Sequence, residues 1–201
     1  MFFGVEELKA SIRRWFRDNM NGNPKMDNFK PIRLQLKDNP SYPHKPVWGQ
    51  RPLSMINKII VHQELADGDT ESVHRYHISE NSHLKQGGAP RIAYHFTVEK
   101  DGTVYQVNEL KDIVWHCRGQ NIESIGIMLC GNFDGPTHKG TGSPTSIQIQ
   151  GLKNLLNYLS EELKFSDRPY TFIRGHCDFG KENCPGNEVI YFLRNQYRKG
   201  F

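Results

Sequence analysis

A histidine and a cysteine near the end of the chain have the residue types and the spacing to bind one metal ion. His176 and Cys184 enclose a short polar loop that contains Gly180, and Pro185-Gly186 follows the cysteine. The hydrophobic segment 171–173 leads into the loop, and an amphipathic segment leads out, so we expect the loop to be fixed at both ends. Imidazole and thiolate are typical zinc ligands in proteins.

Two side chains do not hold a zinc ion, and His62 is the best candidate for a third ligand. His62 ends the apolar run Ile59-Ile60-Val61, which predicts a buried strand. Three protein ligands leave a fourth position to water, which is the catalytic arrangement, whereas closed sets of four are structural. We therefore predict one open Zn²⁺ site per chain, formed by His62, His176 and Cys184.

Other histidines and cysteines are competing candidates. His74, His77 and His83 gather on one segment, which we interpret as a solvated helix face. Cys177 is adjacent to His176 and points in a different direction, so we interpret it as a packing or bystander thiol. A structural zinc or redox site that uses Cys177 and Cys184 is the alternative from another class of protein.

Length and composition set limits on the protein. The 201 residues fit one domain with an extension. The net charge of +4 and the scattered Lys and Arg residues favour an anionic surface such as a cell wall and argue against a nucleic-acid partner. No run approaches the roughly 20 apolar residues of a membrane helix, so we expect no stable membrane insertion. These features do not define an oligomeric state.

The first residues lack the basic and apolar regions of a signal peptide. We therefore expect synthesis in the cytoplasm, with another release route for any work outside the cell. Without a secretion signal, the four cysteines are expected to be reduced thiols.

The hydrophobic pattern predicts an extension followed by a domain with a mixed sheet. An amphipathic helix over Val5–Asn19 and an irregular arm fill residues 1–46, and the main domain occupies residues 47–201. Strands are predicted at Lys58–His62, Arg91–Glu99, Val104–Val107, Ile113–His116, Ser124–Cys130 and around Ile173.

Helices are predicted between these strands. One helix is capped by Thr70, one begins at Ser143-Pro144, and the last contains Val189 to Leu193. The buried stripe of the second helix is predicted to contain Ile147, Leu152, Leu155, Leu156, Leu159 and Leu163. The fold class is therefore α/β, a central mixed β-sheet flanked by helices. Catalytic groups are expected at strand ends and loops, where His62, Tyr94 and His176 fall.

Six short segments occur in the order found in one enzyme family. They are Trp48-Gly49-Gln50-Arg51-Pro52, Ile59-Ile60-Val61-His62, Ile92-Ala93-Tyr94-His95-Phe96 with Asp101-Gly102-Thr103-Val104-Tyr105, Trp115-His116, Ser124-Ile125-Gly126-Ile127 with Gly131-Asn132-Phe133, and Gly175-His176 with Cys184-Pro185-Gly186. In these segments the chain resembles the zinc-dependent N-acetylmuramoyl-L-alanine amidases of the type-2 class, which include phage endolysins and animal peptidoglycan recognition proteins. The resemblance covers about Val47 to Arg194.

The resemblance implies both a fold and a reaction. It implies a central mixed sheet with helices packed on it, a zinc ion in a surface groove, and peptidoglycan as the substrate along that groove. The implied reaction is hydrolysis of the amide between N-acetylmuramic acid and L-alanine. The implied ligands are again His62, His176 and Cys184. Family members with serine in place of Cys184 are typically binders without hydrolysis, so Cys184 favours an enzyme.

The resemblance also assigns catalytic residues, with one departure. Tyr94 matches the family's catalytic tyrosine and would donate a hydrogen bond to the developing oxyanion. Many members carry Lys or Thr two residues before the last ligand, whereas this chain has Glu182 there and Lys181 one place earlier. Either Glu182 acts as a base, or Lys181 stabilises the transition state. The glutamate that recycling-type amidases place after Ser-Ile-Gly-Ile is replaced by Met128.

Two further residues are candidate substrate contacts. His116 follows Trp115 at a position where relatives place a groove histidine, and its alternative role is structural. Asn132 has a weaker claim of the same kind. His95 alternates with Tyr94 along the strand, so we expect it to face the core.

These features favour a phage or prophage endolysin that degrades the cell wall. The alternative function is a peptidoglycan-binding module without hydrolysis, because Glu182 departs from the family pattern.

Overall fold

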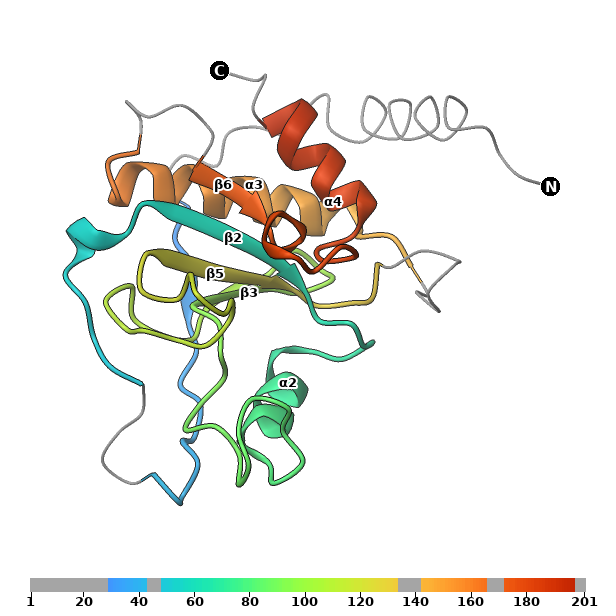
Figure 1. Ribbon diagram of the computed structural model, residues 1–201. Helices are drawn as coiled ribbons and strands as arrows, with labels where there is room; N and C mark the ends of the chain where they lie inside the picture. The colour runs from blue at the N-terminus through green and yellow to red at the C-terminus, as the bar shows by residue number, and fades with distance from the viewer. Residues whose placement is uncertain (1–28, 43–47, 134–141, 166–171, 198–201) are drawn as a thin grey trace.

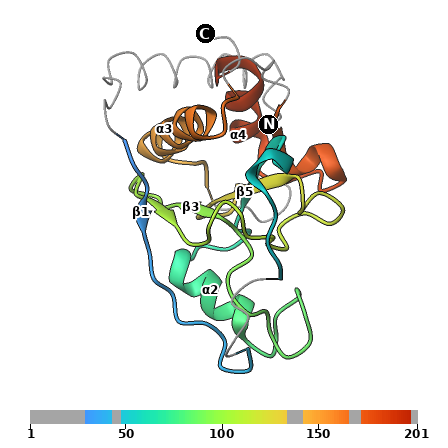
Figure 2. The same cartoon turned by 90° about the vertical axis from the view of Figure 1, so that its left-hand side faces the viewer.

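The computed structural model describes residues 29–42, 48–133, 142–165 and 172–197 (Figure 1). The helix predicted over Val5–Asn19 lies outside these residues. Within the described chain, one mixed sheet carries helices on both of its faces (Figure 2). The predicted fold class is confirmed.

The sheet has six strands in the order β1-β4-β3-β5-β2-β6. β3 and β4 form the predicted antiparallel hairpin, and the other neighbouring strands are parallel. The apolar strands β2 and β5 lie next to each other inside the sheet, where both of their faces are covered. The strands are β1 (Ile32–Arg33), β2 (Lys58–Gln63), β3 (Phe96–Val98), β4 (Val104–Gln106), β5 (Ser124–Leu129) and β6 (Ile173–Gly175).

Helices α3 (Ser146–Glu162) and α4 (Asn187–Tyr191) cover one face of the sheet, and α2 (Thr70–Ile78) covers the other (Figure 2). The π-helical segment η4 (Phe192–Tyr197) continues α4. Two short 3₁₀ helices, η1 (Leu53–Met55) and η3 (His176–Phe179), complete the elements. Among the described helices, none has the length and apolarity needed to cross a bilayer.

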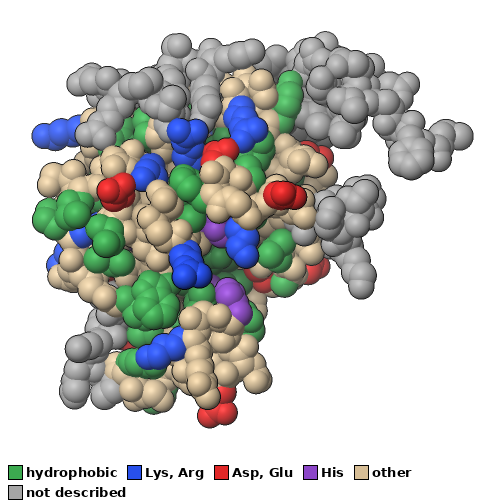
Figure 3. Space-filling view, in the orientation of Figure 1, with side chains coloured by type: hydrophobic (Ala, Val, Ile, Leu, Met, Phe, Trp, Pro, Cys, Tyr) green, Lys and Arg blue, Asp and Glu red, His purple; other side chains and the backbone are tan. Residues whose placement is uncertain are grey.

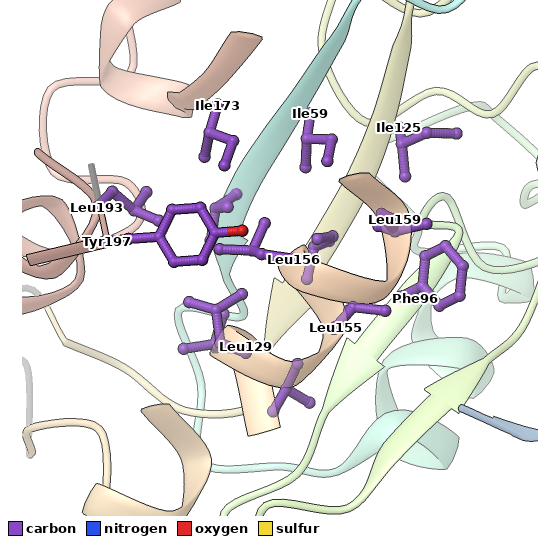
Figure 4. Packing of buried hydrophobic residues seen from close by; sticks show 14 of the residues in the cluster. Ile59, Phe96, Ile125, Leu129, Leu155, Leu156, Leu159, Ile173, Leu193 and Tyr197 are labelled. Carbon is purple, nitrogen blue, oxygen red and sulfur yellow. The ribbon is translucent and has the colours of Figure 1, made fainter. Parts of the chain in front are cut away.

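The main hydrophobic core lies between the sheet and α3 (Figure 4). Alternate residues of β5, Ile125, Ile127 and Leu129, belong to this core together with Leu155 and Leu156 of α3. On the opposite face, Met128 of β5 and Cys130, directly after β5, enter a smaller cluster with Val73 of α2. The alternation of side chains therefore places one face of the sheet in the main core. The α2 face carries the smaller cluster and has room for polar groups.

Two predicted strands differ from the observed ones, and one observed strand was not predicted. Residues Ile113–His116 form no strand, because the amide of Ile113 donates to Gly49 outside the sheet at 2.9 Å. The strand predicted over Arg91–Glu99 is limited to β3, because the Asn108 amide group donates to the carbonyls of Ile92 and Tyr94 and replaces ladder bonds there. Conversely, the arm predicted as irregular contributes β1, which pairs with β4.

Three helix details were also wrong. Ile147 is 57% exposed, whereas the neighbouring helical position Ile149 is fully buried with the leucines of the predicted stripe. Thr145 caps α3, one residue after the predicted Ser143-Pro144 start. Asp69, and not Thr70, caps α2 through a reciprocal pair of hydrogen bonds with Ser72.

The crossing of α3 over the β3–β4 turn depends on Gly151. A Cβ atom at Gly151 would lie 2.5 Å from the Gly102 carbonyl oxygen, a backbone atom that cannot move aside alone. We expect Gly151→Ala to lower the free energy of unfolding by about 1–3 kcal/mol, as overpacking does. Urea denaturation measures this change. The control Gly142→Ala, where a Cβ meets nothing within 4 Å, should change the stability by less than about 0.5 kcal/mol. Equal effects of the two substitutions would contradict this packing account.

His95 predicts a loss of stability in acid. Its Nδ1 accepts from the Gly126 amide at 3.0 Å and its Nε2 donates to the Asp112 carbonyl at 2.9 Å. Burial, aided by the charge of Arg51, lowers the pKa of His95 to about 3. An unfolded histidine has a pKa of about 6.5, so the unfolded state binds the proton first. The stabilisation is fully present above about pH 6.5 and is lost as the pH falls toward 3.

We expect His95 to contribute at most about 1.4 kcal/mol per pH unit to this loss. Urea denaturation at pH 7, 6 and 5 measures it. His95→Gln removes this titration, so its stability should fall less between pH 7 and 5 than that of the wild type. Identical pH dependence in the two proteins would show that His95 does not stay neutral in the fold.

Candidate metal centre

The parallel pairing of β2 with β6 brings two predicted ligands to the same end of the sheet. Val61 is opposite Gly175 in the register, so His62 and His176 follow at adjacent positions. The centroids of the two imidazole rings are 4.3 Å apart. His62 is buried and His176 is half-buried, so the pair joins the interior to the surface. On the face shown in Figure 3, histidine side chains lie near the middle, with Lys or Arg side chains beside them.

The loop after β6 folds back and brings Cys184 to the two histidines. The amide of Cys177 donates to the Cys184 carbonyl at 2.7 Å, and the amide of Cys184 donates to the Lys181 carbonyl at 2.8 Å. Gly180, with φ of 87°, ends η3 in the left-handed conformation that favours glycine. The Cys184 sulfur consequently lies 3.9 Å from Nδ1 of His62.

The three donors fit a zinc ion. The ligand atoms of His62, His176 and Cys184 all lie within 4.8 Å of one another, and in the described part of the chain no fourth His, Cys, Asp or Glu joins the group. Tetrahedral zinc, with bonds of about 2.3 Å to sulfur and about 2.0–2.1 Å to nitrogen, requires donor separations of about 3.3–3.8 Å. The observed 3.9 Å between sulfur and nitrogen is close to this requirement.

Both imidazoles are held in the neutral form that metal binding requires. Burial is the main cause that lowers the pKa of His62 well below its usual value, and the neighbouring His116 and His176 add to it. Burial and then the charge of Lys181 lower the pKa of His176 to about 4. Near neutral pH, protons therefore do not compete for these two nitrogens.

Tyr94 lies beside the cluster as a hydrogen-bond donor. Its ring centroid is 5.2 Å from that of His62. Burial, with smaller contributions from Cys184 and Glu64, raises the pKa of the Tyr94 hydroxyl. The hydroxyl therefore keeps its proton at neutral pH and can donate it in a hydrogen bond.

Lys181 and Glu182 occupy one exposed turn before Cys184. The charge of Lys181 lowers the pKa of both His176 and His83, so its ammonium group acts on the cluster. Glu182 is not among the charges that shift the pKa of His62, His176 or Tyr94. Of the two side chains, Lys181 is therefore the one whose charge acts on a predicted ligand, and the choice between Lys181 and Glu182 stays a prediction.

The two predicted substrate contacts occupy different environments. His116 is only 6% exposed and lies behind His62, with its Nδ1 3.0 Å from Nε2 of His62. Asn132 is half-buried and donates to the Leu65 carbonyl at 3.2 Å. Asn132 therefore helps to hold the loop after β2, and His116 contacts a predicted ligand.

The interpretation of His74, His77 and His83 as a solvated helix face was wrong for two of the three. His74 and His77 are buried, and only His83 is exposed. Nε2 of His74 lies 2.9 Å from the Lys37 carbonyl, and Nδ1 of His77 accepts from the Ala93 amide at 3.1 Å. His74 and His77 therefore join α2 to neighbouring segments. Cys177 is half-buried and does not belong to the metal-binding group.

The sequence reasoning missed the contribution of Gln63. Its amide donates to the Cys184 sulfur at 3.4 Å, and its side chain donates to the Asn183 carbonyl at 2.5 Å and accepts from the Phe133 amide. Gln63 thus ties the end of β2 to the loop that carries Cys184. The available signal was a long polar side chain directly after His62, where alternation places it on the buried face of a strand.

The N-acetylmuramoyl-L-alanine amidase family matches residues 50–187, which include every residue of the cluster. The chain belongs to this family, as its sequence segments predicted.

Individual relatives include phage proteins and solved structures. The endolysin of Enterobacteria phage T3 is 32% identical over 105 residues, which are 52% of this chain and 66% of that protein. The amidase LysC from Clostridium intestinale is 25% identical and aligns with 80% of this chain and 91% of its own, with a TM-score of 0.59. A peptidoglycan recognition protein of Apis mellifera, 17% identical, shares the fold over 83% of this chain and 96% of its own, with a TM-score of 0.63.

The cluster predicts that zinc stabilises the protein through Cys184. A ligand that binds only the folded state adds about 2.7 kcal/mol when its concentration is 100 times its dissociation constant. Saturating Zn²⁺ should therefore raise the melting temperature of chelator-treated protein, and Cys184→Ser should reduce this rise. The matched control, Cys177→Ser in the same loop, should keep it. A full zinc response in Cys184→Ser would exclude Cys184 as a ligand.

Proposed function

We propose that this chain is a zinc-dependent amidase that hydrolyses the bond between N-acetylmuramic acid and L-alanine in peptidoglycan, as a phage or prophage endolysin. The observation that carries the proposal is the convergence of His62, His176 and Cys184 beside Tyr94, inside the segment that matches the amidase family. The likeness to phage endolysins supports the same function. The alignment spans 66% of the T3 and T7 proteins, about two thirds of their length.

Each side chain of the site has a role in the proposed hydrolysis. His62, His176 and Cys184 would hold the zinc ion, which when bound would supply Lewis-acid chemistry to a carbonyl group and to water. Three protein ligands leave room for water or substrate beside them. The Tyr94 hydroxyl donates a hydrogen bond to the oxyanion that develops on the attacked amide carbonyl. Because burial raises its pKa, this donor keeps its proton throughout the reaction.

Lys181 supplies positive charge at the rim of the site. Lys181 is exposed, and its charge lowers the pKa of His176, which supports a role in stabilising negative charge at the site. We assign transition-state stabilisation to Lys181. A substitution of the neighbouring Glu182 tests this assignment. Asn132 remains a candidate substrate contact. Its side chain donates to the Leu65 carbonyl and so holds the loop after β2.

The release of stem peptides from purified cell-wall sacculi tests this function. With zinc present, the wild type should release peptides with new N-terminal alanine, and Cys184→Ser should not. Tyr94→Phe should lower the turnover number by about 10²–10³, as the loss of one oxyanion donor does. Lys181→Ala should lower it more than Glu182→Gln, its neighbour on the same exposed turn. A larger effect of Glu182→Gln would assign the catalytic role to the carboxylate.

The same assay distinguishes the second candidate function. A non-hydrolytic module would sediment with sacculi while the amide bonds stay intact, whether or not zinc is present. The departure from the family pattern at Glu182 motivates this candidate, whereas the cysteine at position 184 favours hydrolysis. Binding without peptide release by zinc-loaded wild-type protein would therefore overturn the proposed function in favour of the binding module.

A further inference from the structure

A series of hydrogen-bonding groups connects a backbone carbonyl with the metal centre. The Ser124 hydroxyl donates to the Gln120 carbonyl at 2.6 Å and lies 3.0 Å from Nε2 of His116. Nδ1 of His116 lies 3.0 Å from Nε2 of His62, whose other nitrogen faces the Cys184 sulfur. The series therefore ends at a ligand atom.

The chemistry of these groups fixes the direction of every hydrogen bond. A carbonyl oxygen only accepts, so the single hydroxyl hydrogen of Ser124 is used at Gln120. The Ser124 oxygen must then accept from Nε2–H of His116. A neutral imidazole has one N–H, so Nδ1 of His116 is an acceptor and takes the hydrogen from Nε2–H of His62. Nδ1 of His62 is left with its lone pair directed at the position of the metal.

Burial keeps both imidazoles neutral, which this assignment requires. His62 is 1% exposed and His116 is 6% exposed. A proton added to Nδ1 of His116 would lie opposite Nε2–H of His62 across the 3.0 Å contact, so this contact requires Nδ1 of His116 to be the acceptor.

The start of the series is anchored firmly. The Gln120 carbonyl also accepts from the Glu123 amide at 3.1 Å, which closes a turn. Arg51, only 4% exposed, donates to the carbonyl of Asn121 inside this turn and to the carbonyl of Ser124 directly after it. The turn that carries the acceptor of the Ser124 hydroxyl is therefore held by charge-assisted hydrogen bonds.

Gly126 makes room for the His116 ring. A Cβ atom at Gly126 would lie 2.5 Å from Cγ of His116. Ser124 and Gly126 are two residues apart on β5, so both face the same side of the sheet. One provides the oxygen that His116 bonds, and the other provides the space that its ring fills.

We propose that His116 and Ser124 are positioning residues that hold His62 in its Nε2–H tautomer and so reserve Nδ1 for the metal. This inference rests on the proposed zinc site. It replaces the predicted contact of His116 with substrate, because both ring nitrogens of His116 are engaged inside the protein. Loss of such a partner of a metal-binding histidine typically lowers metal affinity 10- to 100-fold.

Matched substitutions at position 116 separate this role from simple packing. Oδ1 of asparagine is attached to Cγ as Nδ1 of histidine is, so His116→Asn keeps an acceptor for His62. His116→Gln carries its amide one bond further, toward Ser124, and leaves His62 without that acceptor. In full-length protein, we expect competition with a chromophoric zinc chelator to show a 10- to 100-fold loss of Zn²⁺ affinity for His116→Gln and a loss below threefold for His116→Asn. Ser124→Ala should fall between them.

The tautomer of His62 provides a readout that packing alone would not change. Long-range proton–nitrogen NMR spectra of zinc-free wild type should show His62 protonated at Nε2 and unprotonated at Nδ1. His116→Gln and Ser124→Ala should each shift part of the population toward the Nδ1–H form, and His116→Asn should not. If His116→Gln does not fold, Ser124→Ala and His116→Asn still decide the question.

Two results would overturn the proposal. One is a wild-type His62 that carries its proton on Nδ1, and the other is wild-type zinc affinity in both Ser124→Ala and His116→Gln. Failure of the proposed function is recognised separately, because a wild type that binds no zinc or releases no peptide removes the zinc amidase. The tautomer of the zinc-free protein then still tests the hydrogen-bond series.

Discussion

The register between β2 and β6 is the constraint on which the metal centre depends. Val61 opposite Gly175 places His62 beside His176, although 114 positions separate them in the numbering of the chain. Side chains alternate along a strand, so a slip of one residue would turn His62 toward the core under α3. The large apolar residues of β2, Ile59 and Val61, are fully buried in that core and oppose such a slip. Core packing thus sets the position of a polar ligand.

Polar contacts around the site hold two of the predicted ligands, His62 and Cys184, in place. Gln63 joins the end of β2 to the loop that carries Cys184, and the loop closes on itself between Cys177 and Cys184. His116 meets His62 from the interior. His62 and Cys184 are therefore restrained by neighbours before a metal binds, which reduces the ordering cost of binding. Tyr94 lies on another segment, whereas Lys181 belongs to the loop of Cys184, whose amide donates to the Lys181 carbonyl.

The sequence predicted the parts of this structure that depend on local pattern. Apolar runs marked β2 and β5, the Asp101-Gly102 turn marked the β3–β4 hairpin, and leucine spacing marked α3. The three ligands were found from residue type and from the family resemblance, and the structure brings them together. Residue type alone left several other histidines as competitors.

The remaining features depend on contacts between distant segments, which local pattern does not contain. His74 and His77 are buried because the Lys37 carbonyl and the Ala93 amide provide partners. The sequence of residues 113–116 predicts a strand, but the amide of Ile113 donates to the Gly49 carbonyl outside the sheet. The two residues of β1 become a strand only because the edge of β4 is free to pair. The role of His116 required the positions of Ser124 and Gly126 on a folded β5.

X-ray absorption at the zinc edge of the metal-loaded, full-length protein tests the central claim most directly, because it counts the atoms around the ion. The account predicts one sulfur at about 2.3 Å and nitrogen or oxygen neighbours at about 2.0–2.1 Å, with two of them imidazoles. Cys184→Ser should remove the sulfur signal, and Cys177→Ser should leave it in place. A spectrum with no sulfur, or with two, would contradict a centre built from His62, His176 and Cys184.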